Sequence, residues 1–333
     1  MRWSRSHIPT LRDDPADAEA PSHRLLVRAG FVRQLMAGVY SMLPLGYRVR
    51  SKVMAVIREE IDRIGGQEFL LPDMHPIDIW EQTGRAEKMA DILLTIEDHR
   101  GSRIVLGPTH EEIFTTVAKE LTSYRQLPQL WYHIQTKFRD EPRPKAGLLR
   151  TREFTMKDSY TFDVDEAGLD VQFDRHEEAY RRIFRRLGMD AVAVKASSGA
   201  MGGSESIEFM VASAAGEDDV AACRSCGYAG NVEKATSALA PIGDAAGPAV
   251  PERFPTPGVR TIEDLAEFAG GAPAERQVKT LVYFLDGEPA LVLLRGDHDL
   301  IEQKLLDGTG ATEVRPARHD EIRPLLGADA GSL

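Results

Sequence analysis

Residues 131–158 read WYHIQTKFRDEPRPKAGLLRTREFTMKD and are the most informative part of this chain about its fold. Both of its ends alternate polar and apolar side chains, the period of a half-buried β-strand. Strands are therefore expected over 131–141 and 150–158, joined by a loop with two prolines and a glycine at 142–147. The pattern predicts a β-hairpin.

The hairpin concentrates positive charge in an acidic protein. The whole chain has a net charge of −11, yet residues 137–157 contain seven Lys or Arg and only three acids. The strand period places arginines and Phe154 on one side. That arrangement suits a nucleotide, because arginine makes bidentate hydrogen bonds with phosphate and phenylalanine stacks on a base. A solvated basic hairpin with Phe154 in the core has the same pattern, and composition and period alone favour this second interpretation.

A second polar group is expected where a short strand over 103–106 turns into a helix that begins at His110. Thr109 and Glu112 have the spacing of a capping box, in which Thr109 would bind first-turn amides. Glu111 lies in the same turn, where the positive end of the helix favours a carboxylate. Because the helix gives Glu111 no other partner, its carboxylate is free to hold a cationic ligand.

Two longer amphipathic helices are expected, over 49–64 and 168–187. In the second, Glu177/Arg181 and Glu178/Arg182 have the i,i+4 spacing of ion pairs. Arginines on this helix could contact a nucleic acid, but their acidic neighbours favour a solvated helix face.

Composition is typical of a globular protein with two domains. The 333 residues exceed the roughly 100–200 of one domain, and 42% hydrophobic with 28% charged residues are ordinary values. No apolar run reaches the ~18 residues that span a bilayer, and the start of the chain lacks a secretory signal. We therefore expect a cytoplasmic protein with no membrane partner.

The character of the sequence changes after residue 216. Ala, Pro and Gly dominate 235–258, which predicts a linker or loop. We place the domain boundary between 216 and 235, and divide the chain into domains 1–225 and 226–333. The second domain is expected to contain a helix around 261–269, strands over 280–285 and 290–294, and a helix from about 300 to 306.

Several of these segments together resemble one family. Phe138-Arg139-Asp140-Glu141, a loop, and then Arg150-x-x-x-Phe154-x-x-x-Asp158 is similar to motif 2 of the class II aminoacyl-tRNA synthetases. Helix 49–64 with Gly65-Gly66 and a buried strand that ends at Pro72 resembles motif 1, which builds the dimer interface in that class. Within the class, the chain resembles bacterial-type prolyl-tRNA synthetases over nearly its whole length. The supporting segments are 15–19, 106–112, 135–141, 152–158 and 216–219.

The resemblance implies an α+β fold, a class II antiparallel sheet flanked by helices with an inserted mixed α/β editing domain. It implies ligation of proline to tRNA(Pro) through a prolyl-adenylate, by a homodimer whose interface includes Pro72. Thr109 and Glu111 would hold the proline amine. Arg139, the catalytic residue, would bind the proline carboxylate and the ATP α-phosphate, and would stabilise the pentavalent centre electrostatically.

The family also implies how ATP is held. Glu141 and Phe154 would recognise adenine, by a hydrogen bond and by stacking. Arg150 has the basic position of the motif and would reach ATP, for which Arg152 is a weaker candidate. Mg²⁺ would bridge the phosphates as in phosphoryl transfer generally, and no residue of this chain is assigned as a metal ligand.

The second domain resembles the editing insertion of the same family. Each missing methylene changes binding by only ~1–3 kcal/mol, so a proline pocket rejects alanine poorly and a second site would hydrolyse alanyl-tRNA(Pro). Lys279 matches the editing-domain lysine, although exposed lysines at strand ends are common. Cys223-x-x-Cys226 resembles half of a zinc knuckle. Because a structural zinc site needs four ligands and the chain has two cysteines, zinc is not expected.

The chain departs from the family at its C-terminal end. It stops at residues 331–333, before the rest of the editing domain, motif 3 and the anticodon-binding domain that family members carry. We therefore expect the N-terminal portion of a longer enzyme, incomplete for proline activation. Two alternatives stay open: an inactive or regulatory paralogue that binds tRNA, and an aminoacyl-tRNA deacylase that acts through the Lys279 domain.

Overall fold

The computed structural model describes residues 2–16, 18, 20–197, 205–213, 216, 218–236, 243, 250 and 252–328. The chain divides into two compact units, Met1–Ala193 with Phe209–Glu217, and Val194–Glu208 with Asp218–Leu333. Segments 15–19 and 216–219 lie only partly within the described residues. Much of the predicted linker 235–258 and the chain end at 331–333 lie outside them.

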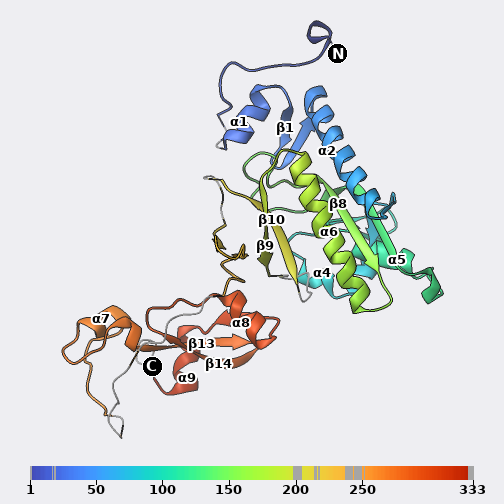
Figure 1. The fold of residues 1–333 in the computed structure, drawn as a ribbon. Coiled ribbons are helices and arrows are strands. Elements are labelled where there is room, and N and C mark those ends of the chain that lie inside the picture. Colours follow the sequence, from blue (N-terminus) through green and yellow to red (C-terminus); the bar gives the residue numbers. More distant parts are fainter. Residues whose placement is uncertain are drawn as a thin grey trace. The chain divides into compact units, whose positions relative to one another are not determined.

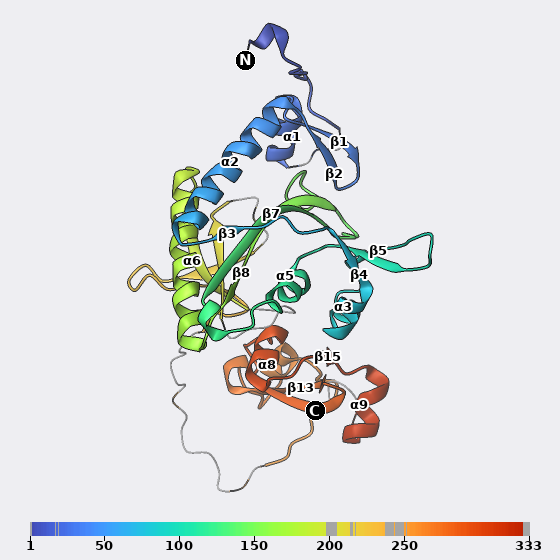
Figure 2. The same cartoon turned by 90° about the vertical axis from the view of Figure 1, so that its right-hand side faces the viewer.

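The predicted hairpin forms the centre of the first unit. β7 (Gln129–Phe138) and β8 (Glu153–Phe162) pair antiparallel along their whole lengths, and β3 (Gln67–Glu68) adds in parallel to β7 (Figure 2). The register sets Lys137 opposite Phe154. Because opposed residues point to the same side of a sheet, polar side chains from both strands collect on one face.

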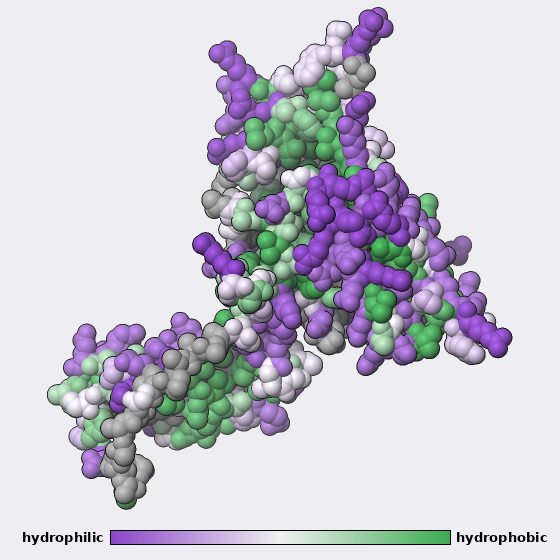
Figure 3. Space-filling view, in the orientation of Figure 1, coloured by the Kyte–Doolittle hydropathy of each residue, from purple (hydrophilic) through white to green (hydrophobic). Residues whose placement is uncertain are grey.

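The other face of this sheet packs against two long helices, α2 (Pro44–Arg63) and α6 (Glu166–Arg186) (Figure 1). The outward face of α6 is covered with hydrophilic side chains (Figure 3). Among the described residues, no helix combines the length and the apolar character needed to cross a bilayer. The core between sheet and helices consists of Ile61, Leu130, Tyr132, Ala179 and Ile183.

A second three-stranded sheet leads into residues 107–110, which are called the site loop below. It has the antiparallel order β4–β6–β5, and its helices pack Ile77 and Trp80 onto Val105. The backbone N–H of Phe138 donates to the Gly107 carbonyl over 3.1 Å, which joins the loop to the end of β7. The elements are β4 (Met74–Pro76), α3 (Ile77–Gln82), α4 (Arg85–Lys88), β5 (Leu94–Glu97), β6 (Arg103–Leu106) and α5 (Glu111–Ala118).

Short elements complete the first unit. The N-terminal hairpin of β1 and β2 lies beside the start of β8, where the Arg152 N–H donates to the Gly38 carbonyl over 2.8 Å. These elements are η1 (Trp3–Arg5), α1 (Pro21–Arg28), β1 (Val32–Met36), β2 (Val39–Met42) and η2 (Tyr124–Gln126).

The second unit is built on a sheet with the order β14–β13–β15, antiparallel throughout. Its elements are α7 (Ile262–Glu267), η4 (Ala274–Arg276), β13 (Val278–Leu285), β14 (Glu288–Arg295), α8 (Glu302–Thr309), β15 (Val314–Pro316) and α9 (His319–Leu326). A further sheet, at the division between the units, has the order β10–β9–β12–β11. Its strands are β9 (Ala191–Ala196), β10 (Ser206–Val211), β11 (Val220–Ala222) and β12 (Ala229–Asn231).

The structure corrects the buried strand predicted between Gly65-Gly66 and Pro72. Only Gln67 and Glu68 form a strand, and both are exposed, as is Leu70 at 81%. The reason is that β3 is an edge strand that pairs with β7 over Gln67 and Glu68 only, so Leu70 lies beyond the paired segment. The preceding helix also begins earlier than predicted, because Pro44 stands at its first position and fits there.

One buried carboxylate joins the two long helices. Glu60 of α2 has a fully buried side chain, whose oxygens accept from Arg182 over 2.7 Å and from Arg186 over 2.8 Å. Arg63 adds a third contact at 3.0 Å. Burial alone would raise the pKa of Glu60, but the arginine hydrogen bonds hold this pKa below its usual value. Arg182 thus binds Glu60 more closely than its predicted partner Glu178, which lies 3.7 Å away.

We predict that Glu60→Ala lowers the free energy of unfolding of the first unit by about 2 kcal/mol. The loss stays below that of a fully buried pair because water reaches all three arginines once the carboxylate is gone. Urea unfolding followed by tryptophan fluorescence measures it, since Trp3, Trp80 and Trp131 all lie in this unit. Glu59→Ala, at an exposed neighbouring carboxylate, is the control and should cost much less. Equal losses would contradict the assignment.

Candidate functional site

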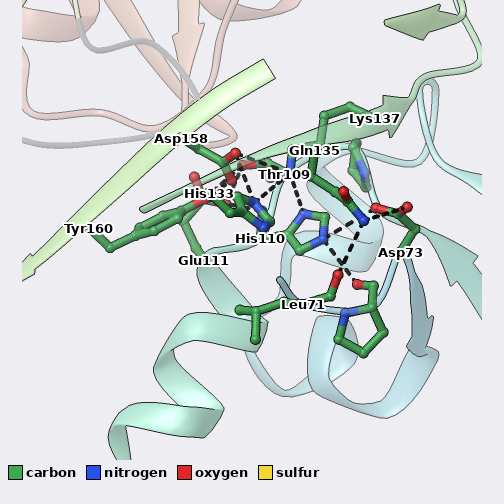
Figure 4. A network of polar contacts seen from close by, with 12 residues as sticks. Leu71, Asp73, Thr109, His110, Glu111, His133, Gln135, Lys137, Asp158 and Tyr160 are labelled. Carbon is green, nitrogen blue, oxygen red and sulfur yellow. Dashed lines mark hydrogen bonds and ion pairs between the residues drawn. The ribbon is translucent and has the colours of Figure 1, made fainter. Parts of the chain in front are cut away.

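The candidate site lies on the face of β7 and β8 opposite the one that packs against α2 and α6. Figure 4 shows its side chains from close by. The residues that line it are His133, Gln135 and Lys137 from β7, Asp158 and Tyr160 from β8, and Thr109, His110 and Glu111 from the loop into α5. The loop fits closely because of Gly107, where a β-carbon would lie 2.7 Å from the His75 ring. No larger residue fits there without moving His75.

Thr109 and Glu111, both predicted from the sequence, bind each other. The buried Thr109 hydroxyl donates to Glu111 Oε2 over 2.6 Å. Arg85 Nη1 lies 3.1 Å from the same oxygen and 2.9 Å from Glu112. The Glu111 carboxylate is 36% exposed, so it is anchored and still accessible to a ligand.

The predicted capping box at Thr109 and Glu112 is therefore wrong. Helix α5 begins at Glu111 with His110 at the N-cap and no side-chain cap hydrogen bond. Thr109 precedes the cap by one residue, so its hydroxyl reaches the side chain of Glu111 instead of the first-turn amides.

Arg139 lies just beyond the end of β7, beside this pair. Its Nη2 donates to the Pro108 carbonyl over 3.3 Å, and its guanidinium carbon lies 5.3 Å from the centre of the Phe154 ring. Burial lowers the pKa of Arg139, while the charges of Glu111 and Glu141 oppose this shift. Its buried Nε has no hydrogen-bond partner among the described residues. This guanidinium therefore retains a donor for an anion.

The remaining predicted ATP residues lie in the loop of the hairpin and at its base. Arg150 Nε is 4.0 Å from a Glu141 carboxylate oxygen, and the Arg150 side chain is half exposed. Arg152 Nε donates to the Glu141 carbonyl over 3.0 Å. The structure therefore places Glu141, Arg150 and Arg152 together, and Phe154 beneath Arg139.

A buried polar network beneath Thr109 and Glu111 was missed by sequence reasoning. The fully buried Lys137 ammonium lies 2.7 Å from His110 Nδ1, 2.8 Å from His133 Nε2 and 3.1 Å from Asp158 Oδ1 (Figure 4). Asp158 Oδ2 accepts a hydrogen bond from Tyr160 over 2.7 Å. The strand period put Lys137 on this face, but no signal in the sequence marked it as buried.

Burial keeps His110 and its neighbour His75 neutral. It lowers the pKa of His110 to about 3 and that of His75 to about 4, and the Lys137 charge adds to both shifts. Burial would raise the pKa of Asp158, yet hydrogen bonding to His133 and the Lys137 charge hold it below the usual value. The Lys137 ammonium and the Asp158 carboxylate therefore lie beside a neutral His110 ring.

The tautomer of His110 follows from its contacts. Since Nδ1 accepts from Lys137, the proton stands on Nε2, which donates to the Pro72 carbonyl over 3.0 Å. His75 Nε2 contacts the same carbonyl at 3.0 Å. Pro72, predicted at a dimer interface, is exposed. Its carbonyl accepts from His110 and contacts His75, and so helps to hold the site loop.

Three side chains of the network have the geometry of metal ligands. Among the residues that the structure describes, His110, His133 and Asp158 form the one group of three or more candidate ligands within 4.8 Å of one another. The Lys137 ammonium lies between them. Cys223 and Cys226, in the β11–β12 hairpin, are free thiols outside any such group in the described ranges.

Lys279, the predicted editing residue, lies at the start of β13. Its ammonium is 3.4 Å from Asp299, whose side chain is fully exposed. An exposed ion pair of this kind contributes little to stability. The amino group can therefore exchange its partner for a ligand.

Comparison with known proteins places the site in two known domain types. Residues 94–237, which include the whole network, match the family described as tRNA synthetase class II core domain (G, H, P, S and T). Residues 256–333, which include Lys279, match the aminoacyl-tRNA editing domain.

Whole-chain relatives are similar over all of this sequence. The chain is 58% identical to a proline–tRNA ligase 1 of Anaeromyxobacter dehalogenans and 51% identical to a proline–tRNA ligase of Acidobacterium capsulatum. It spans 58% and 59% of their lengths. A solved prolyl-tRNA synthetase of Cryptosporidium parvum, complexed with halofuginone and AMPPNP, shares its fold at TM-score 0.51 and 19% identity, over 56% of this chain and 39% of that one. The predicted fold class is thus confirmed.

We predict that acid destabilises the first unit through His110. Below about pH 6.5 a histidine in the unfolded chain binds a proton, whereas buried His110 stays neutral down to its pKa of about 3. The free energy of unfolding therefore falls by about 1 kcal/mol per pH unit for each such histidine. The loss is absent above the unfolded pKa. Urea unfolding at about pH 7, 6 and 5 should show a shallower pH slope for His110→Gln. His99→Gln, in an exposed turn, should keep the wild-type slope, and an unchanged slope in His110→Gln would refute the prediction.

Proposed function

Because the chain belongs to the class II aminoacyl-tRNA synthetases, as its motifs predicted, we propose that it activates proline with ATP and serves the ligation of proline to tRNA(Pro). One observation carries the proposal: the anchored carboxylate of Glu111 and the guanidinium of Arg139 lie at the same end of the polar face. An amino acid is a zwitterion, so it needs one group of each sign. The proline–tRNA ligases that resemble the chain along its whole length support the choice of proline.

In this proposal the two charged groups act on opposite ends of proline. The secondary ammonium pairs with the Glu111 carboxylate and with the Thr109 oxygen. The proline carboxylate lies against Arg139, attacks the α-phosphorus of ATP and forms the acyl–phosphate bond as pyrophosphate leaves. Arg139 stabilises the charge that develops on phosphorus without transferring a proton.

The hairpin would hold the nucleotide. Adenine stacks on Phe154, whose ring already lies against the Arg139 guanidinium, and its exocyclic amine donates to Glu141. Arg150, half exposed, is free to turn toward the phosphates. The solved relative in complex with AMPPNP supports an ATP site in this fold.

Mg²⁺ fits the nucleotide better than it fits the protein. The one ligand-type group among the described residues contains two imidazoles and surrounds an ammonium, whereas Mg²⁺ prefers six oxygens. We therefore propose that Mg²⁺ enters with the phosphates, and we derive no step from it.

The test is amino-acid-dependent exchange of pyrophosphate into ATP. It is run on the protein from the complete reading frame and on residues 1–333 in parallel. Proline-stimulated exchange by the complete protein supports the proposal, and the shorter chain shows how much of the activity lies in these residues. If no amino acid stimulates exchange by the complete protein, the result would favour the tRNA-binding paralogue or the deacylase.

We predict that Glu111→Gln raises the KM for proline by roughly 10–100-fold, the value of a lost charge-assisted contact. The KM for ATP should stay nearly constant, because Arg85 keeps its pair with Glu112 and the loop stays folded. Glu97→Gln, at an exposed position of β5, is the control. An equal rise in both KM values would count against Glu111 as the ammonium partner.

A second candidate function rests on the match of residues 256–333 to an editing domain. We propose that Lys279 contacts mischarged alanyl-tRNA(Pro) during its hydrolysis. Its weak pair with Asp299 leaves the ammonium available for an anionic group.

The prediction is that Lys279→Ala slows ATP-independent deacylation of alanyl-tRNA(Pro) while proline-dependent exchange stays at the wild-type rate. Lys304→Ala, on α8 of the same unit, serves as the matched control. Deacylation at the wild-type rate in Lys279→Ala would remove this residue from the editing site.

Three further proposals concern the domain boundary, the cellular location and the oligomeric state. We propose that domains 1–225 and 226–333 divide activation from editing, that the protein acts in the cytoplasm, and that it is a homodimer with Pro72 at the interface. The exposed apolar residues Leu70 (81%) and Met74 (56%) on either side of Pro72 support the interface. The molecular mass of the protein in solution shows whether it is a dimer. Cell fractionation shows whether it is in the cytoplasm. Separate expression of residues 1–225 and 226–333 tests the domain boundary.

A further inference from the structure

The buried cluster around Lys137 has the geometry of a metal site that holds an ammonium instead of a metal. Three donor atoms, from His110, His133 and Asp158, lie within 4.8 Å of one another. The Lys137 nitrogen is within hydrogen-bond distance of all of them, at 2.7, 2.8 and 3.1 Å (Figure 4). Two ring nitrogens and one carboxylate oxygen therefore surround the buried ammonium.

We propose that Lys137 is an internal cation that positions the amine-binding pair, Thr109 and Glu111. It does not touch the substrate itself. It holds the loop between β6 and α5 in the conformation in which the Glu111 carboxylate faces the ligand. The inference rests on the proposed function of these two residues.

The first route from Lys137 to the pair runs through His110. Lys137 donates to Nδ1 of this ring, and Nε2 donates to the Pro72 carbonyl, so the ring is held from both sides. His110 lies between Thr109 and Glu111 in the chain. Fixing its ring therefore fixes the backbone that carries both ligand-binding side chains.

The second route runs through β8. Lys137 pairs with one oxygen of Asp158, and the other oxygen accepts from the Tyr160 hydroxyl. That hydroxyl in turn accepts from the His110 backbone N–H at 3.2 Å and lies 3.5 Å from the Thr109 hydroxyl. Both routes start at Lys137 and reach the site loop, the first directly through the His110 ring and the second through Asp158 and Tyr160 of the neighbouring strand.

Charge balance explains why a cation is required. Asp158 is buried, and burying a lone carboxylate costs several kcal/mol. Without the ammonium, a proton or a metal ion must take its place, and the imidazoles must turn or protonate. The loop above them then loses its fixed support. Because the contact of Arg150 with Glu141 and the position of the Phe154 ring involve none of these loop residues, the ATP side should be less affected.

The first test separates positioning from simple stability. Lys137→Met keeps the aliphatic stem and removes the charge, in the protein from the complete reading frame. We expect the KM for proline to rise by about 10–100-fold, as for other partners that orient a binding group, with little change in the KM for ATP. Lys157→Met is the matched control, since Lys157 lies on the opposite face of the same hairpin, 4.7 Å from the Tyr180 ring.

The second test reads the ligand set without any reaction. Lys137→Ala removes the internal cation, and two imidazoles and a carboxylate then suit Co²⁺ or Zn²⁺. Titration with Co²⁺ alone should give the visible absorption of a bound, low-symmetry ion at one equivalent. Wild type and Lys157→Ala should give none.

A folded Lys137→Met protein with the wild-type KM for proline overturns the proposal. An equal rise in the KM values for proline and for ATP overturns it as well. Failure of both Lys137 variants to fold would make this a stability residue and would also overturn it, as would a Lys137→Ala protein that binds no Co²⁺. If wild type shows no proline dependence, the proposed function fails, while Co²⁺ binding still tests the internal cation.

Discussion

The pairing register of β7 with β8 is the constraint on which the rest of the first unit depends. One face of the pair buries Leu130 and Tyr132 against two helices, so the alternate residues must point the other way. A slip of one residue would turn Lys137 toward the apolar core and expose Tyr132 to the polar network. Packing on the hydrophobic face of the sheet thus determines which side chains stand on its polar face.

The polar side is covered by protein, and this determines how its charges can be arranged. A buried ion is stable only with a partner and a full set of hydrogen bonds. The site meets this with the Lys137 ammonium beside the Asp158 carboxylate, while burial lowers the pKa of His110 to about 3 and that of His75 to about 4. Glu111, at the edge of the same network, remains accessible at 36% exposure. The buried cation is therefore paired with a buried anion, and the accessible carboxylate lies at the edge.

The sequence predicted those parts of the structure that depend on neighbouring residues. The hairpin, its loop and the two long helices all follow from local periodicity and turn residues. What it could not predict depends on distant pairs. Arg182 was assigned to Glu178, four residues away, yet its closer partner is Glu60, 122 residues away. Burial of Lys137 likewise depends on His110, 27 residues before it, and no local pattern encodes that contact.

Lys137 and Arg139 show most clearly what the period of a strand leaves undecided. Both are cations on one face, two residues apart, and the sequence alone treats them alike. Lys137 is fully buried, and its compact ammonium lies among two ring nitrogens and the Asp158 carboxylate, so no part of it faces a ligand. Arg139 lies beyond the end of the strand, where the covering loop meets it through a single carbonyl, and its larger fork keeps a donor without a partner in the described residues. Depth of burial thus separates a cation that holds the protein together from one that can hold a substrate.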